Sequence, residues 1–138
     1  MLGISNFTGT NFYKKMNKQI LLIDDDEDEQ FIFQEALKEV SATAKCIGAL
    51  TADDALKILQ SLLPDFIFLD INMPVINGFE CLELIKNHTD FNSIPVVIYS
   101  TGVNDSVYNK ALKKGAVACI KKQNSIQALA NVLKIFLF

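Results

Sequence analysis

Acidic, hydroxyl and basic side chains follow the short apolar runs of this sequence. One run ends in Asp24 and Asp25 and another in Asp70, while Ser100 and Lys122 follow two later runs. Three carboxylates gathered at one place would repel one another and raise each other's pKa unless a cation lay between them. Oxygen ligands without histidine or cysteine are those that Mg²⁺ prefers, and Mn²⁺ accepts the same ligands. These residue types therefore favour a divalent-cation site.

The same residues could bind a phosphoryl group. Mg²⁺ with open coordination positions binds phosphate oxygens, and a lysine ammonium and a hydroxyl add further donors for the anion. Asp70 precedes a loop that contains Pro74 and Gly78, and an aspartate can act as a nucleophile that forms an aspartyl phosphate. Catalysis then depends on position and charge neutralisation more than on acid–base chemistry.

Apolar segments alternate with segments of helical period along the chain. Strands are predicted at residues 18–24, 44–50, 65–70, 94–100 and 116–121, and helices at 29–40, 52–63, 79–88, 105–115 and 125–136. Pro64 should end the second helix, and Gly115 should cap the fourth. Strands that are apolar on both faces and alternate with helices predict a parallel sheet covered on both sides.

For a chain of this length we expect an α/β fold, a flavodoxin-like (βα)5 doubly wound parallel five-stranded sheet in the order 2-1-3-4-5. Ligands of such sheets bind beyond the carboxyl ends of the strands, at the switch between strands 1 and 3. The polar residues follow those ends, so this fold should gather them on one rim.

The composition is that of a globular chain with an uneven distribution of charge. Its 138 residues suit one domain with a single core, and half of them are hydrophobic. The net charge of −3 disfavours general affinity for nucleic acid. From Phe91 onward Asp105 is the only acid, against six lysines. The apolar runs are far shorter than the roughly 20 residues of a membrane span, so we expect a cytoplasmic protein without membrane association.

The first 17 residues differ from the rest. They lack a basic segment followed by an apolar stretch, so they do not resemble a secretory signal. We expect a polar leader at 1–17, with Met16 as an alternative initiator, and one domain at 18–138.

Four collinear motifs of the chain resemble the receiver domain of two-component response regulators: "ILLIDDDEDE", "DFIFLDINMPVINGFE", "IPVVIYST" and "GAVACIKK". The resemblance covers about residues 18–136. It implies a stand-alone receiver in which Asp70 accepts a phosphoryl group from a histidine kinase or a histidine phosphotransfer protein. Such a protein would signal by contact with an as yet unidentified downstream protein.

The resemblance also implies roles for the other residues of the rim. Asp24 and Asp25 would hold Mg²⁺ together with the acceptor carboxylate. Of the two, Asp25 is the one expected to coordinate the ion directly. Asn72 would contribute its backbone carbonyl to the metal. Ser100 would be the switch hydroxyl, and Lys122 would pair with the acceptor carboxylate or its phosphate.

Two positions depart from the family. Gln123 follows the lysine where the family usually has a proline, often after a cis peptide, so we expect a loop of different shape. Cys119 stands where many members have a rotating Tyr or Phe on the fifth strand. An aromatic swing coupled to Ser100 is therefore not expected, although Tyr99 could affect the packing.

Three other functions stay open on the sequence. A degenerate receiver would only bind partners, independently of phosphorylation. A Mg²⁺-dependent phosphohydrolase that works through an aspartyl phosphate would need an acid two residues after its nucleophile, where Asn72 stands. An FMN carrier would need a Ser/Thr/Gly-rich loop after the first strand, where this chain has six acids. We favour the receiver, which is not an enzyme.

The remaining polar and apolar features have simpler interpretations. The acids 26–29 should begin the next helix, where they meet the positive end of its dipole. His88 should be neither a metal ligand nor a base. The last helix has more apolar residues than one buried stripe requires, the additional ones being Val132, Ile135 and Phe138. This surplus favours a partner-binding or homodimer face on that helix.

Overall fold

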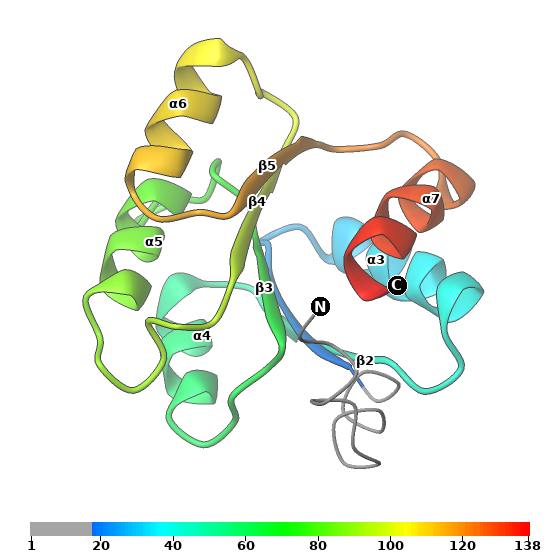
Figure 1. Ribbon diagram of the computed structural model, residues 1–138, viewed down its shortest axis with the longest axis horizontal. Coiled ribbons are helices and arrows are strands. Elements are labelled where there is room, and N and C mark those ends of the chain that lie inside the picture. Colours follow the sequence, from blue (N-terminus) through cyan, green and yellow to red (C-terminus); the bar gives the residue numbers. More distant parts are fainter. Residues whose placement is uncertain (1–17) are drawn as a thin grey trace, which may run out of the picture.

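Five strands alternate with five helices in the part of the chain that the computed structural model describes, residues 18–138 (Figure 1). The strands are β1 (Gln19–Ile23), β2 (Lys45–Ala49), β3 (Phe66–Leu69), β4 (Val96–Ser100) and β5 (Ala118–Lys121). The helices are α3 (Glu27–Val40), α4 (Ala52–Leu59), α5 (Gly78–Lys86), α6 (Asp105–Lys113) and α7 (Ile126–Leu137). The predicted leader and Met16 lie outside the described residues.

The strands form one parallel sheet in the order β2-β1-β3-β4-β5, which confirms the predicted flavodoxin-like topology. Ile23, the last residue of β1, pairs with Leu69, the last residue of β3. Asp24 and Asp70 follow these two residues directly. The switch in strand order therefore brings them to neighbouring positions on one rim.

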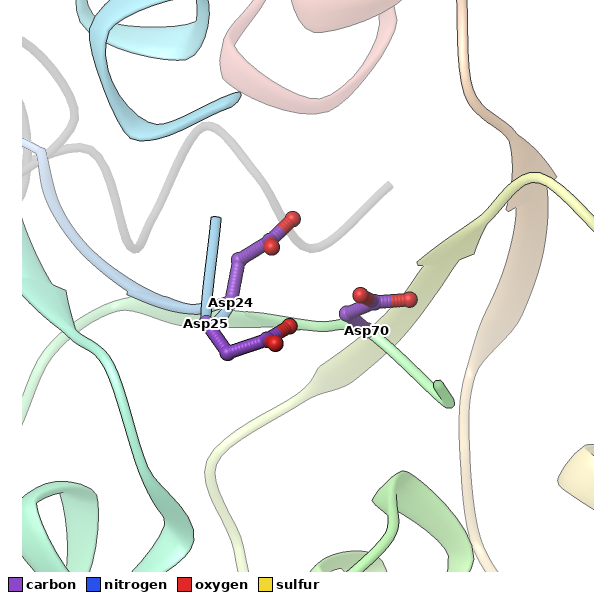
Figure 2. A group of neighbouring side chains, drawn as sticks. All are labelled: Asp24, Asp25 and Asp70. Carbon is purple, nitrogen blue, oxygen red and sulfur yellow. The ribbon is translucent and has the colours of Figure 1, made fainter. Parts of the chain in front are cut away.

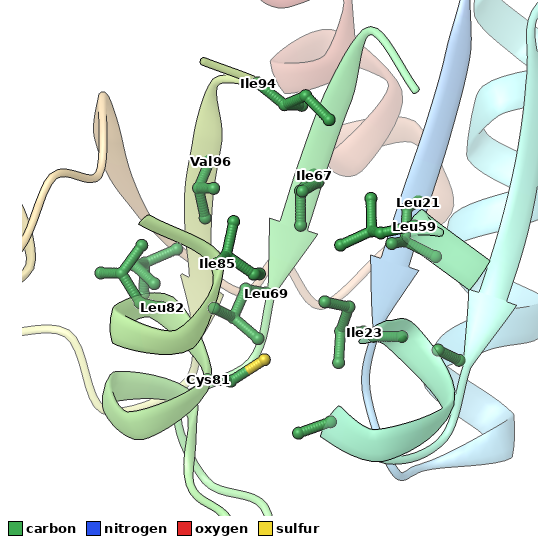
Figure 3. Close-up of a cluster of buried hydrophobic side chains, with 14 of the residues drawn as sticks. Leu21, Ile23, Leu59, Ile67, Leu69, Cys81, Leu82, Ile85, Ile94 and Val96 are labelled. Atoms are coloured by element: carbon green, nitrogen blue, oxygen red, sulfur yellow. The ribbon is translucent and has the colours of Figure 1, made fainter. Parts of the chain in front are cut away.

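Helices cover both faces of the sheet, with α4, α5 and α6 on one side and α3 and α7 on the other (Figure 1). Successive side chains of β1 point to opposite faces, so Leu21 and Ile23 enter one core cluster and Ile20 and Leu22 the other. Figure 3 shows the first cluster, in which strand side chains meet those of α4 and α5. Burial on both faces explains why the three central strands, β1, β3 and β4, are largely apolar, whereas the edge strands β2 and β5 are more exposed.

Two helix ends show how local chemistry sets the boundaries. Gly115 has φ of +104° after α6, and the N–H of Ala116 reaches the carbonyl of Ala111 at 3.0 Å, so the predicted glycine cap is present. The predicted end of the second helix at Pro64 is wrong, because α4 ends at Leu59. Leu63, the last residue of the predicted helix, is 61% exposed and therefore adds little to the core.

Among the described residues, no helix combines the length and the apolar character that crossing a membrane requires.

Candidate functional site

Three carboxylates from two neighbouring strand ends face a common space (Figure 2). One oxygen from each of Asp24, Asp25 and Asp70 lies within 4.8 Å of the others. Asp24 and Asp70 are buried, with 1% and 5% of their surface exposed, whereas Asp25 is exposed. The sequence prediction that these three side chains meet on one rim therefore agrees with the geometry.

Backbone hydrogen bonds hold Asp24 at the turn from β1 into α3. Its N–H donates to the carbonyl of Ala49 at 3.0 Å, and its Oδ1 accepts from the N–H of Asp26 at 3.0 Å. Asp26 in turn caps α3 by accepting from the N–H groups of Asp28 and Glu29. The acidic block is thus divided as predicted, with two acids at the site, Asp26 at the N-cap and the other three in the first turn of the helix.

Asp70 is held in the same way at the end of β3. Its N–H donates to the carbonyl of Ile23 at 2.9 Å, and its Oδ1 accepts from the N–H of Asn72 at 3.2 Å. The start of α5 approaches this residue closely, because a Cβ placed on Gly78 would lie 2.3 Å from the carbonyl oxygen of Asp70. Only glycine fits there, which accounts for Gly78 at the end of the loop.

Lys122 is the one basic side chain among residues 18–138 that forms ion pairs with Asp24 and Asp70. Its Nζ lies 2.7 Å from Asp24 Oδ2 and 3.5 Å from Asp70 Oδ2, and its side chain is 9% exposed. Glu29 Oε2 lies 4.0 Å from the same atom, a contact that the sequence did not predict. The neighbouring Lys121 is exposed. Of the two lysines, the structure thus places Lys122 at the carboxylates, and its closest partner is Asp24 rather than Asp70.

The pocket holds more negative charge than Lys122 balances. Burial raises the pKa of Asp24, even though its bonds to Lys122 and to the Asp26 N–H act in the opposite direction. Burial by itself would lower the pKa of Lys122, but Asp24, Asp70 and Glu29 outweigh it and raise that pKa. Asp24, Asp25, Asp70 and Glu29 thus face a single ammonium, which leaves a surplus of negative charge that a divalent cation would reduce. The donor set consists of hard oxygens, which fits Mg²⁺ or Mn²⁺.

Ser100 and Asn72 meet across the rim. Ser100, at the end of β4, is 1% exposed, and its Oγ lies 3.3 Å from Asn72 Nδ2. The sequence predicted a role only for the backbone carbonyl of Asn72, and the contact of its side chain was missed. The two residues are 28 positions apart, so only the spatial arrangement of β3 and β4 reveals the pair.

The loop after β5 has an anchor that a proline could not provide. The backbone N–H of Gln123 donates to the phenol oxygen of Tyr99 at 3.1 Å, and the described residues contain no cis peptide bond. Tyr99 is 2% exposed, and burial raises its pKa. This bond joins the residue before Ser100 to the residue after Lys122. The sequence left open how Tyr99 affects the site. In the structure, its hydroxyl oxygen anchors the loop after β5.

The other singled-out residues lie in ordinary surroundings. Cys119 is half-buried on β5, and burial raises the pKa of its thiol. His88 stacks on Phe91 with ring centroids 4.0 Å apart, and its Nδ1 accepts from the N–H of Asp90. Ile135 on α7 is 76% exposed and Phe138, directly after the helix, is 79% exposed, whereas Val132 is half-buried.

Comparison with known proteins identifies the family. The model of the response regulator receiver domain matches residues 20–134. PilG of Pseudomonas aeruginosa is 33% identical over 118 residues, which are 84% of this chain and 84% of that protein. Other relatives are longer, and the chain spans about half of their length or less. The chain belongs to the response regulator receiver domain family.

Solved structures agree with this assignment. The phosphorylated cyanobacterial phytochrome response regulator RcpA has a TM-score of 0.78 at 26% identity, over 87% of this chain and 91% of that chain. The Mn²⁺-bound form of response regulator Rcp1 has a TM-score of 0.75 at 27% identity, over 86% and 91% of the two chains. Receiver domains are signalling domains of two-component systems, and the family binds a divalent metal in an acidic pocket. The cluster of Asp24, Asp25 and Asp70 fits such a pocket.

Proposed function

We propose that this protein is a single-domain response regulator in which Asp70 accepts a phosphoryl group from a histidine kinase or a histidine phosphotransfer protein. The observation that carries the proposal is the buried Asp70 carboxylate, which lies beside two further aspartates and 3.5 Å from the Lys122 ammonium. The phosphorylated state of the related RcpA supports it. The output would be contact with a downstream protein.

The metal in this proposal is Mg²⁺, with Mn²⁺ as a substitute. The carboxylates of Asp24, Asp25 and Asp70 and the backbone carbonyl of Asn72 would hold it. When bound, the ion neutralises negative charge on the transferring phosphoryl group. The surplus of carboxylates over ammonium groups at the site and the Mn²⁺-bound form of the related Rcp1 support this assignment.

The side chains of the protein supply the rest of the chemistry. A carboxylate oxygen of Asp70 forms a bond to phosphorus while the bond from phosphorus to the donor breaks, and the donor leaves with the bonding electrons. The phosphoryl group brings about 1.5 to 2 negative charges to the rim. Lys122, now nearest to Asp24, then pairs with the phosphoryl oxygens. Ser100 turns away from Asn72, and its hydroxyl donates a hydrogen bond to these oxygens.

The same site is poorly equipped for rapid hydrolysis. An aspartyl-phosphate phosphohydrolase needs a proton donor two residues after its nucleophile, and the amide of Asn72 cannot transfer a proton in that way. This favours storage of the phosphoryl group over turnover. Gln123 and Cys119 depart from the family, and they favour the degenerate receiver as the second candidate.

Intact-mass measurement with a small phosphodonor tests the proposal. With acetyl phosphate and Mg²⁺, the wild-type protein should gain the mass of one phosphoryl group, and removing Mg²⁺ should abolish the gain. Asp70→Asn should gain nothing, whereas Asp90→Asn, a matched change of an exposed aspartate, should behave as wild type. No gain by the wild type would favour the degenerate receiver, and rapid consumption of the donor would favour the phosphohydrolase.

We further propose that residues 18–138 form the receiver domain after a leader at 1–17, and that the protein works in the cytoplasm. A homodimer through α7 is proposed because Ile135 and Phe138 present apolar surface to solvent. Light scattering should show a dimer for the wild type and a monomer for Ile135→Glu. A monomeric wild type would contradict this part of the proposal.

A further inference from the structure

One buried polar side chain lies beside the site without belonging to it. Four polar or charged residues are buried among the described residues, and Asp24, Asp70 and Ser100 are three of them. The fourth is Gln30 on α3, which is 8% exposed. A buried amide needs hydrogen-bond partners to offset the cost of its desolvation. The partners of Gln30 therefore indicate its role.

The amide nitrogen of Gln30 faces the carbonyl ends of two strands. Nε2 lies 3.0 Å from the carbonyl oxygen of Asp24, 3.1 Å from that of Leu22 and 3.2 Å from that of Ala49. Its two N–H groups are shared among these three acceptors. The Ala49 carbonyl also accepts from the N–H of Asp24. Gln30 thus links the end of β1 to the end of β2 at the peptide group between Asp24 and Asp25.

Gly48 on β2 leaves the space that this amide occupies. A Cβ at Gly48 would lie 2.4 Å from Gln30 Oε1 and 2.9 Å from Gln30 Cδ, far closer than atoms can approach. Gly48 pairs with Leu22 within the regular ladder of the sheet. The glycine is therefore required for its missing side chain rather than for an unusual backbone conformation.

We propose that Gln30, seated over Gly48, is a positioning residue that holds the metal ligands Asp24 and Asp25. The inference rests on the proposed metal site. Fixing the Asp24 carbonyl fixes the peptide plane from which the Asp25 side chain begins. Carboxylates that repel one another must be kept in place by hydrogen bonds from neighbouring residues, because the repulsion otherwise moves them apart before the ion binds. Partners of this kind typically contribute 10- to 100-fold to metal affinity.

Calorimetric titration of the full chain with Mn²⁺ tests the inference. Gln30→Met keeps the length of the side chain but removes the donor, and it should weaken Mn²⁺ binding at least about tenfold. Gly48→Ala should weaken binding similarly, because the methyl group displaces the amide. Gln34→Ala, an exposed site on α3, and Gly102→Ala, where a Cβ would meet no atom within 4 Å, should bind as wild type.

A double-mutant cycle separates positioning from general damage to the fold. In a Gln30→Ala background there is no amide to displace, so adding Gly48→Ala should cost no further affinity. An equal loss in both backgrounds would overturn the inference. So would wild-type Mn²⁺ affinity in Gln30→Met, even if that variant unfolds more easily.

Hydrogen exchange in the metal-free protein provides a readout that does not depend on the metal. The amides of Asp24 and Asp26 should exchange faster in both Gln30→Met and Gln30→Ala than in Gln34→Ala, while amides in β4 remain unchanged. If the wild type itself fails to bind Mn²⁺, the proposed metal site is wrong. The hydrogen-exchange result alone then tests whether Gln30 holds the Asp24–Asp25 segment in place. Unchanged exchange at Asp24 and Asp26 would overturn that role.

Discussion

Replacing Tyr99 with Phe removes a single hydroxyl and leaves one identifiable backbone donor without its acceptor. The wild-type bond runs from the Gln123 N–H to the phenol oxygen at 3.1 Å, on a ring that is 2% exposed. A net hydrogen bond contributes about 0.5–1.5 kcal/mol, and a fully buried unpaired donor costs about 1–3 kcal/mol. Gln123 is only half-buried, so water can reach it in part, and we expect a loss of about 1 kcal/mol.

Two assays measure this loss. Urea denaturation should show the lower free energy of unfolding, and the melting temperature should fall by about 4 °C. The exchange rate of the Gln123 amide should rise about fivefold, which is the rate equivalent of about 1 kcal/mol. Tyr108→Phe is the matched control, since Tyr108 is 43% exposed, and its effect should stay below about 0.5 kcal/mol. Equal stability of the two variants, with unchanged exchange at Gln123, would refute the reasoning.

Two further predictions concern a strained residue and a buried acid. Val75 is 99% exposed at φ of +67°, a left-handed conformation that is unfavourable for a β-branched side chain, so Val75→Asn should stabilise the protein by about 1 kcal/mol in urea denaturation. A lower midpoint would contradict the strain. Burial raises the pKa of Asp24, so the folded state binds its proton more tightly than the unfolded state does. This stabilisation is complete at acidic pH and is lost as the pH rises through the raised pKa. In EDTA, Asp24→Asn should therefore gain stability relative to wild type as pH increases from about 4 to 7. A relative loss over that range would show that the sign is wrong.

Much of the fold and the outline of the site follow from the sequence, because local patterns determine them. Strands buried on both faces are apolar throughout, and a parallel sheet places the residues after its strands on one rim, which located Asp24, Asp25 and Asp70. The pairs Asn72–Ser100 and Tyr99–Gln123 could not be predicted in this way, since they join distant residues through space.

Gln30 did leave a signal in the sequence. It lies three residues before the buried Phe33, in phase with the apolar face of α3. A polar residue at a core position suggests a specific partner, but its acceptors on two different strands appear only in the folded structure. The early end of α4 was missed for a related reason, because apolar residues continue to Leu63 although that side chain is exposed.

Locating the phosphoryl group within the chain is the most direct test of the proposed function. The protein is treated with acetyl phosphate and Mg²⁺, reduced with borohydride to convert an aspartyl phosphate into a stable product, and digested for peptide mass mapping. We predict modification at Asp70 alone, with none when Mg²⁺ is left out. Modification of Asp24 or Asp25 instead, or of no aspartate at all, would contradict the assignment of Asp70 as the phosphoacceptor.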